Sequence, residues 1–384
     1  MSRPRRLTPF GVLIALGICN HLVLTGSRVA VSLDALSLGA NAATVGTLLA
    51  LFALLPMLFA IPAGRLADRV GVRGPMLAGS IGIAGAAIIA TAIAGLPALF
   101  VTAVLLGVSF MSFQVATQYA AGEMGPPDAR TRNFGLLAVG YSASSIGGPL
   151  VTGFMIDHVG FRAAFGLLAL LPLVPIAVLG MNRVPFPGPH PAHAAHAGSR
   201  TFELMRNPAL RRVFLINGMI TLAWELHTLF VPIYGNAIGL SASKIGVVLA
   251  AFAMATFTVR LSMPLIARHA PEHRVLTSAL YLAALVYLAI PFSRNAATLM
   301  ALSFVLGLGL GVGQPMVMAL LHSLAPPGRM GEAAGVRMSL MNSMAVAVPL
   351  LFGAVGGTIG LSPVLWSVGV FLATGGWLTR VAKS

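Results

Sequence analysis

The sequence predicts an all-α integral membrane protein with twelve transmembrane helices in two six-helix bundles. Three observations predict this class: the composition, a series of long apolar runs, and a repeat at a constant offset. Hydrophobic residues make up 57% of the 384 residues, charged residues make up 9%, and the mean hydropathy is +0.91. Soluble domains carry roughly 25% charged residues. This chain therefore lacks the polar groups to cover a water-facing surface, which excludes soluble enzymes, disordered chains and disulfide scaffolds.

Each predicted helix is an apolar run long enough to cross a bilayer, which takes about 20 residues. The runs lie at 10–34, 42–63, 74–94, 97–121, 132–156, 160–181, 211–234, 241–265, 274–292, 297–322, 332–355 and 361–380. A membrane β-barrel would need alternating apolar and polar residues. Runs such as 45–61 do not alternate, so we expect helices.

The formal net charge of +15 is interpreted as a topology signal. Eighteen of the 24 Lys and Arg residues fall on the side of the membrane that holds the N-terminus, and three fall within spans. The three on the opposite side are Arg162, Lys244 and Arg294. Because cytoplasmic loops collect Lys and Arg, we expect a multi-pass protein of the inner membrane with both termini in the cytoplasm. No nucleic-acid partner is needed to explain the charge.

The chain also resembles itself when it is shifted by 200 residues. Gly46 meets Gly246, Gln114 meets Gln314, and the double proline at 126–127 meets another at 326–327. Such matches are harder to obtain by chance in an apolar chain than matches of Leu or Ala. We therefore expect two halves, residues 1–181 and 211–384.

The segment between the halves, residues 182–210, is rich in Pro, Gly, Ala and His and has no apolar period. This composition predicts a cytoplasmic linker. His190, His193 and His196 recur at three-residue spacing, so a weak metal site is the alternative to a plain linker. We expect no metal and no cofactor.

The first local motif lies between the second and third predicted spans. It reads Gly64-Arg65-Leu66-Ala67-Asp68-Arg69-Val70-Gly71-Val72-Arg73. This segment resembles the cytoplasmic signature loop of the major facilitator superfamily. With twelve spans, two halves and the linker, the resemblance covers the whole chain and implies the major facilitator fold.

The resemblance also implies a role for the loop in gating. Its residues would be Gly64, Asp68, Arg69, Gly71 and Arg73. Asp68 would latch the halves by contacting the start of the eleventh helix, near 331–333, while the two arginines join the same charge cluster. The alternative is a solvated turn with anchoring cations. The counterpart in the second half, 264–268, lacks both the glycine and the acid.

A second motif, Gly148-Pro149-Leu150-Val151-Thr152-Gly153, lies in the fifth span. Gly148, Pro149 and Gly153 resemble part of the motif of proton-coupled exporters in this superfamily. The alternative is general close packing through small residues. Ala103 stands where such exporters often carry an arginine, so no proton relay is assigned to that position.

Polar side chains inside the membrane mark functional sites by default, because they are costly to insert. Glu225 is the one acid deep in a span and is the candidate for proton coupling; a static pair with Arg28 or His227 is the alternative. Arg28 and Arg337 are candidate anchors for an anionic substrate, although Arg337 and Arg260 could instead reach the interface by snorkelling. The other cavity candidates are His21, Thr25, Gln114, Gln118, Tyr141, Thr221 and Gln314.

We therefore expect a secondary transporter that works by alternating access, with a small-molecule substrate, protons and the lipid bilayer as partners. The leading hypothesis is proton-coupled export of a small organic or amphipathic compound by a monomer. The alternative is proton-coupled uptake of an organic anion. A membrane-embedded enzyme is more remote, because the sequence has no H-E-x-x-H and no G-x-S-x-G motif. A sensor is also more remote, because we expect such a protein to carry a soluble output domain and the longest non-membrane segment is the linker.

Overall fold

The computed structural model confirms the all-helical membrane class. It describes residues 8–125, 130–182, 184–188, 204, 206–325 and 330–381. Within these residues, eleven helical segments are long and apolar enough to cross a membrane, and Leu361–Trp377 is a shorter apolar helix. The described part of the chain contains helices and turns, with no β-strand.

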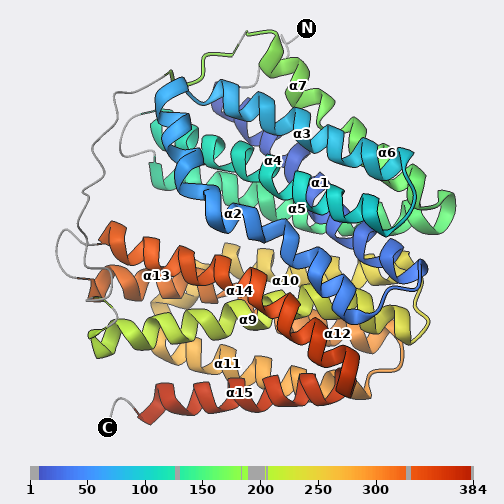
Figure 1. Cartoon of the computed structure of the whole chain (residues 1–384). Coiled ribbons are helices and arrows are strands. Elements are labelled where there is room, and N and C mark those ends of the chain that lie inside the picture. The colour runs from blue at the N-terminus through green and yellow to red at the C-terminus, as the bar shows by residue number, and fades with distance from the viewer. Residues whose placement is uncertain are drawn as a thin grey trace, which may run out of the picture.

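The helices before the linker form one group, coloured blue to green in Figure 1. They are α1 (Pro9–Ser37), α2 (Ala42–Val70), α3 (Arg73–Ala92), α4 (Leu96–Glu123), α5 (Arg130–Val159), α6 (Phe161–Leu170) and α7 (Leu173–Gly180). Local signals set their starts. The Thr8 hydroxyl accepts a hydrogen bond from the amide of Gly11, and Asn41 accepts one from the amide of Thr44, which satisfies free N–H groups at both helix starts.

The helices after the linker form a second group, coloured green to red in Figure 1. They are α9 (Pro208–Ala237), α10 (Ala242–His269), α11 (Glu272–Ala289), η2 (Ile290–Phe292), α12 (Ala296–Gly311), α13 (Gly313–Leu324), α14 (Met330–Ile359) and α15 (Leu361–Val381). The seventh predicted span begins earlier than expected, because Asn207 caps the helix and Pro208 occupies its first turn.

Two predicted spans are interrupted helices. The run predicted at 160–181 divides into α6 and α7 beside Pro172, which has no N–H to continue the helix. The run predicted at 297–322 divides into α12 and α13 at Val312, between two glycines. Apolar composition is unchanged across both breaks, so hydropathy did not reveal them.

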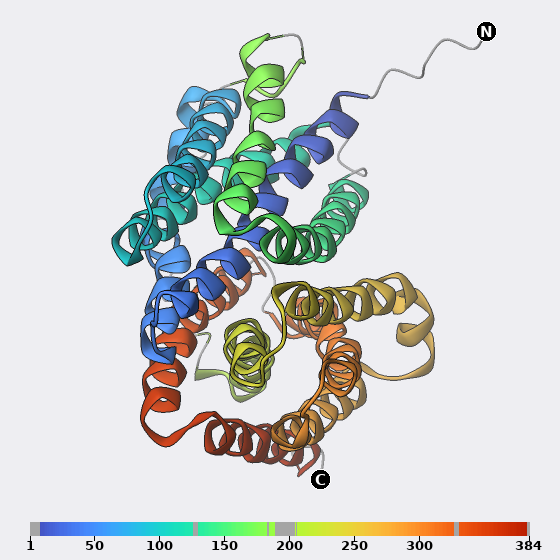
Figure 2. The ribbon, with the colours of Figure 1, turned by 90° about the vertical axis from the view of Figure 1, so that its right-hand side faces the viewer.

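The two groups meet along two seams that repeat at the 200-residue offset (Figure 2). In the α2–α14 seam, a Cβ added at Gly46 would overlap the carbonyl oxygen of Pro349. In the α5–α10 seam, a Cβ added at Gly246 would overlap the carbonyl oxygen of Pro149. An added Cβ at Gly353 or at Gly153 would likewise crowd a carbonyl oxygen in the first turn of the facing helix, that of Ala42 or Ala242. The repeated glycines therefore allow backbone-to-backbone contact between the groups.

Asp157, one turn beyond the seam glycine of α5, adds a polar contact to one seam. Its two carboxylate oxygens accept hydrogen bonds from the amides of Ala242 at 2.9 Å and Ser243 at 2.8 Å. These amides belong to the first turn of α10, where the helix dipole favours an anion. The residue 200 positions later is Gly357, whose added Cβ would lie 3.9 Å from the amide nitrogen of Ala43. The α2–α14 seam therefore lacks the equivalent cap.

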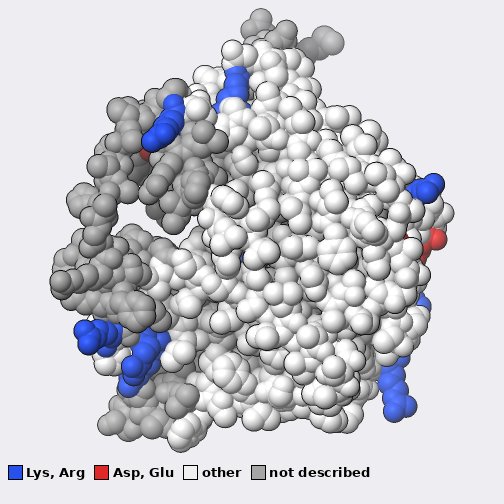
Figure 3. Space-filling model, in the orientation of Figure 1, with Lys and Arg blue, Asp and Glu red and all other residues white. Residues whose placement is uncertain are grey.

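Both seams lie at one end of the molecule, which we call the seam end. At the opposite end, the linker end, α7 finishes and α9 begins (Figure 1). Figure 3 shows the face of the molecule on which the two groups lie one above the other. It also shows charged side chains gathered toward the two ends of the helices, with a mainly uncharged face between them. The described glycine contacts and the Asp157 cap thus hold the two groups together at the seam end.

Candidate functional site

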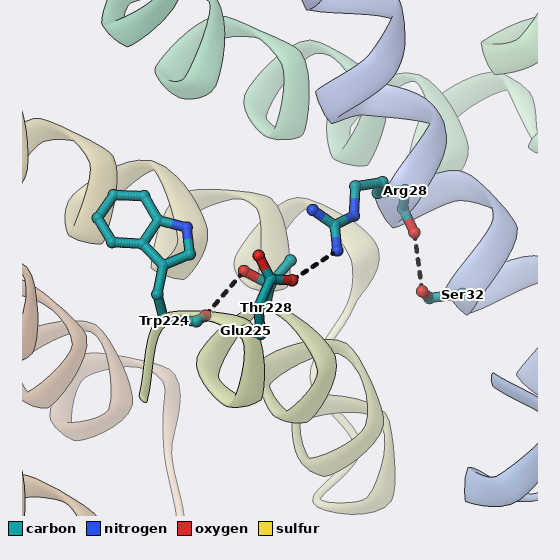
Figure 4. Close-up of polar contacts among 5 residues, drawn as sticks. All are labelled: Arg28, Ser32, Trp224, Glu225 and Thr228. Carbon is teal, nitrogen blue, oxygen red and sulfur yellow. Dashed lines mark hydrogen bonds and ion pairs between the residues drawn. The ribbon is translucent and has the colours of Figure 1, made fainter. Parts of the chain in front are cut away.

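An ion pair between α1 and α9 joins the two groups (Figure 4). An Nη atom of Arg28, on α1, lies 3.0 Å from an Oε atom of Glu225, on α9. The side chains are 22% and 12% exposed, so both charges are largely removed from water. Removing one partner would leave the other as an uncompensated charge in a low-dielectric surrounding, which is strongly unfavourable.

Neighbouring hydroxyls bond to the helix backbone and leave this pair undisturbed. Ser32 donates to the carbonyl of Arg28 at 2.7 Å, and Thr228 donates to the carbonyl of Trp224 at 3.1 Å (Figure 4). Ser and Thr hydroxyls commonly donate their hydrogen bonds to backbone carbonyls in this way within apolar helices. The carboxylate of Glu225 therefore faces Arg28 rather than these hydroxyls.

His227, the alternative partner of Glu225, has a different environment. Its Nε2 atom lies 3.1 Å from the hydroxyl of Ser303, and its ring stacks on Phe252 with centroids 4.2 Å apart. The side chain is 1% exposed. Glu225 thus pairs with Arg28, whereas His227 belongs to the packing between α9, α10 and α12.

A second contact between the groups was missed at the sequence level. Arg260 of α10 donates to the hydroxyl of Ser142 of α5 at 3.0 Å. Its guanidinium carbon also lies 5.9 Å from the ring centroid of Trp224, which suits a cation–π interaction. Arg260 is therefore held between helices rather than reaching the interface. The residue spacing on α5 gave no signal for Ser142, because its partner lies 118 positions away.

Arg337 is the third arginine inside the spans. Its Nε atom donates to the side-chain oxygen of Asn217 at 3.1 Å, and the residue is 8% exposed. Thr221, one turn along α9, donates to the carbonyl of Asn217 and is also buried. Arg337 is therefore buried and bonded to Asn217, and its side chain does not take the snorkelling position that was the alternative.

Aromatic and hydroxyl side chains link α1 to α5. The ring of His21 stacks on Tyr141 with centroids 4.6 Å apart. Thr25 donates to the carbonyl of Ser144 at 3.1 Å. The Nδ1 atom of His21 and the hydroxyl of Tyr141 are buried, and neither has a hydrogen-bond partner among the described residues. Such atoms are available to a polar group that enters the site.

The exporter-like motif serves two interfaces. Gly148 faces α1, where an added Cβ would overlap the Thr25 hydroxyl and lie 2.9 Å from the amide of Gly26. Pro149 and Gly153 instead contribute backbone atoms to the α5–α10 seam. The motif therefore fixes the distance of α5 from its own group on one side and from the second group on the other.

The glutamines do not join this cluster in the described contacts. Gln114 is half-buried, and Gln118 and Gln314 are exposed. Among the described residues, no group of three or more His, Cys, Asp or Glu side chains could hold a metal ion. His190, His193 and His196 lie outside the described residues.

The signature loop is described only in part. The side chains of residues 60–68, which include Gly64 and Asp68, and of Gly331 and Glu332 lie outside the described residues. Arg69 is exposed, and Gly71 ends α2 with a φ of 78°, a conformation that favours glycine. Arg73 donates to the carbonyl of Val184 at 3.2 Å and lies over the ring of Phe186. Arg73 thus holds the segment after α7.

Comparisons with known proteins agree with this architecture. A family model described as Major Facilitator Superfamily matches residues 13–349. A tetracycline resistance protein of class G from Vibrio anguillarum is 29% identical over 347 residues, covering 85% of this chain and 84% of the relative. A class C tetracycline resistance protein from Escherichia coli is 26% identical, covering 81% and 79%.

Two solved structures share the fold at low identity. A POT family transporter in complex with a thioalcohol-conjugated peptide has a TM-score of 0.82 and 15% identity, covering 97% of this chain and 96% of that structure. A peptide transporter POT in complex with sulfate has a TM-score of 0.79 and 16% identity, covering 100% and 96%. At these identities the likeness concerns the arrangement of helices.

Proposed function

We propose that this protein exports its substrate in exchange for protons. The chain belongs to the Major Facilitator Superfamily, and it is thus a multi-pass transporter of small molecules rather than an enzyme. The substrate is a small organic or amphipathic compound. Residues 1–181 and 211–384 act as two bundles that rock about a central site by alternating access. The protein works as a monomer in the inner membrane, and the distribution of Lys and Arg puts the linker end in the cytoplasm.

The observation that carries this proposal is the Arg28–Glu225 ion pair between the two groups. A carboxylate can pair with Arg28 or bind a proton, but a protonated carboxyl no longer attracts the guanidinium. Protonation of Glu225 therefore dissolves a link between the groups, and release of the proton restores it. Proton binding is in this way tied to the relative position of the bundles, which is what coupling requires.

Two further observations favour export. Gly148, Pro149 and Gly153 match part of the exporter motif and lie at the packing contacts of α5. The two sequence relatives described above are named as tetracycline resistance proteins. In the state that closes the linker end, Asp68 would contact the start of α14 and complete the gating role expected of the signature loop.

Vesicle transport tests the proposal. In everted vesicles, an imposed proton gradient should drive substrate accumulation by the unaltered protein and by the control Glu272→Gln, which removes an exposed acid. Glu225→Gln should abolish gradient-driven accumulation and retain substrate exchange in the absence of a gradient. Loss of both activities would assign Glu225 a structural role, and full gradient-driven transport would remove it from coupling.

A second candidate is proton-coupled uptake of an organic anion. Its supporting observation is the excess of positive charge within the spans. Three arginines, Arg28, Arg260 and Arg337, make described contacts there, and only Arg28 pairs with an acid, Glu225. Accumulation in right-side-out vesicles, with none in everted vesicles, would favour uptake over export. Replacing Arg337 by Gln should then raise the KM for an anionic substrate.

A further inference from the structure

An apolar cavity of about 530 Å³ lies in the second group, away from the Arg28–Glu225 site. It is enclosed by α9, α11, α13, α14 and α15. Its wall is apolar and includes Phe214, Gly218, Met219, Leu340, Met344 and Phe371. A volume in this range is typical of cavities that hold a small ligand.

Basic side chains gather at one end of this cavity. Arg211 and Arg212 from the first turn of α9, and His273 from the first turn of α11, belong to its lining. Two helix N-termini therefore meet there, and their dipoles favour an anion. Glu272 precedes His273 and is exposed, but it does not line the cavity. The cavity thus has a basic entrance and an apolar interior.

The depth of the cavity matches one leaflet of a bilayer. Its lining on α9 begins at Ala209 at the linker end, and the part that counts for depth runs from Arg211, which carries the guanidinium, to Leu222. At 1.5 Å per residue this spans about 16 Å. Half of a hydrocarbon core of about 30 Å is about 15 Å. Leu215 and Phe371, 60% and 48% exposed, form an apolar mouth, as expected of an opening toward lipid.

We propose that this cavity binds an anionic phospholipid, with the phosphate at Arg211, Arg212 and His273 and an acyl chain beside Gly218. Basic pockets between transmembrane helices bind acidic lipid headgroups in this way. The site is separate from the ion pair between the groups, so the assignment does not depend on the direction of transport or on proton coupling.

Lipid titration of the purified full-length protein tests the assignment. The probe is phosphatidylglycerol, with phosphatidylcholine of the same chains and glycerol 3-phosphate as comparisons, and binding is measured by native mass spectrometry. We expect saturable binding of phosphatidylglycerol, about 30-fold weaker binding after Arg211→Gln/Arg212→Gln, and little change in the charge-matched control Arg162→Gln/Arg294→Gln.

A second variant fills the cavity without removing charge. An added Cβ at Gly218 meets no atom within 4 Å, so Gly218→Leu points into open space. By displacing about two methylenes of the chain, it should weaken binding about 15-fold. Gly85→Leu, at another open glycine in a helix that does not line the cavity, is the matched control.

Three outcomes would overturn the assignment. Equal affinity for phosphatidylglycerol and phosphatidylcholine would mean that the cavity binds acyl chains regardless of the charge of the headgroup. Equal affinity for glycerol 3-phosphate would indicate a site for free anions. Unchanged lipid binding in both folded variants, judged by their melting temperatures, would place any bound lipid elsewhere on the protein.

Discussion

Asp157 should set the balance between the two access states, because it contacts α10 only while the seam end is closed. Its carboxylate accepts hydrogen bonds from the amides of Ala242 and Ser243, at 2.9 and 2.8 Å. Opening the seam end separates α5 from α10 and exposes these amides. Asp157→Ala removes the contact from the closed seam and takes away nothing equivalent from the open one.

The magnitude follows from the position of the carboxylate at a helix start. Asp157 is exposed, so water screens its charge, and the scale of an ordinary helix cap applies rather than that of a buried ion pair. A cap and its dipole interaction together contribute about 1.4 kcal/mol, which is a factor of about ten in the equilibrium. A state open at the seam end that begins at about 3% would rise to about 24%.

Distances between spin labels measure this change. Labels at Leu38→Cys and Asn236→Cys, at the seam end of α1 and α9, report separation of the groups in a chain whose native cysteine is replaced by Cys19→Ser. Asp157→Ala should raise the long-distance population about eightfold, for a tenfold change in the equilibrium constant. An unchanged distribution in the folded variant would refute the reasoning.

The counterpart of Asp157 offers the reciprocal change. Gly357 lies beside the first turn of α2, with its added Cβ 3.9 Å from the amide of Ala43. Gly357→Asp should therefore cap α2, lower the long-distance population, and compensate Asp157→Ala in the double variant. A shift in the same direction as Asp157→Ala would contradict the role of the cap.

Two further predictions concern packing. Gly46→Leu cannot keep the contact with Pro349, so it should hold the seam end open and speed the alkylation of a cysteine placed there. Gly135→Leu, where an added Cβ meets nothing within 4 Å, is the control and should leave the alkylation rate unchanged. Equal rates in the two variants would contradict the role of the Gly46 contact in closing the seam end. Ser303→Ala leaves the buried His227 ring nitrogen without its partner. The free energy of unfolding, measured by denaturation, should fall by about 1–3 kcal/mol. An unchanged value would mean that this hydrogen bond adds no stability.

The architecture could be predicted from the sequence because hydropathy dominates membrane insertion. Runs of apolar residues gave the spans, and the glycines that recur at 200 residues lie at matching contacts of the two seams. The breaks at Pro172 and Val312 could not be predicted from hydropathy, which is equally high on both sides of each. Proline and glycine inside a membrane helix are compatible with both a kink and an interruption.

The site was predicted less completely. Scarcity of charge selected Arg28 and Glu225, and the structure pairs them. Ser142 and Asp157 were missed for a different reason, since a serine in an apolar helix and an acid at a helix end are both common. Their roles depend on partners from the other group, and a single sequence does not record which residues meet across that distance.

The seams have a consequence for how such a protein diversifies. Their closest contacts, at Gly46 and Gly246, are made by glycine against backbone carbonyls. Backbone atoms are the same whatever the residue, so the moving interface keeps its shape while cavity side chains are exchanged. Selection for a new substrate can therefore act on residues around Arg28 and Glu225 without rebuilding the machinery that switches access.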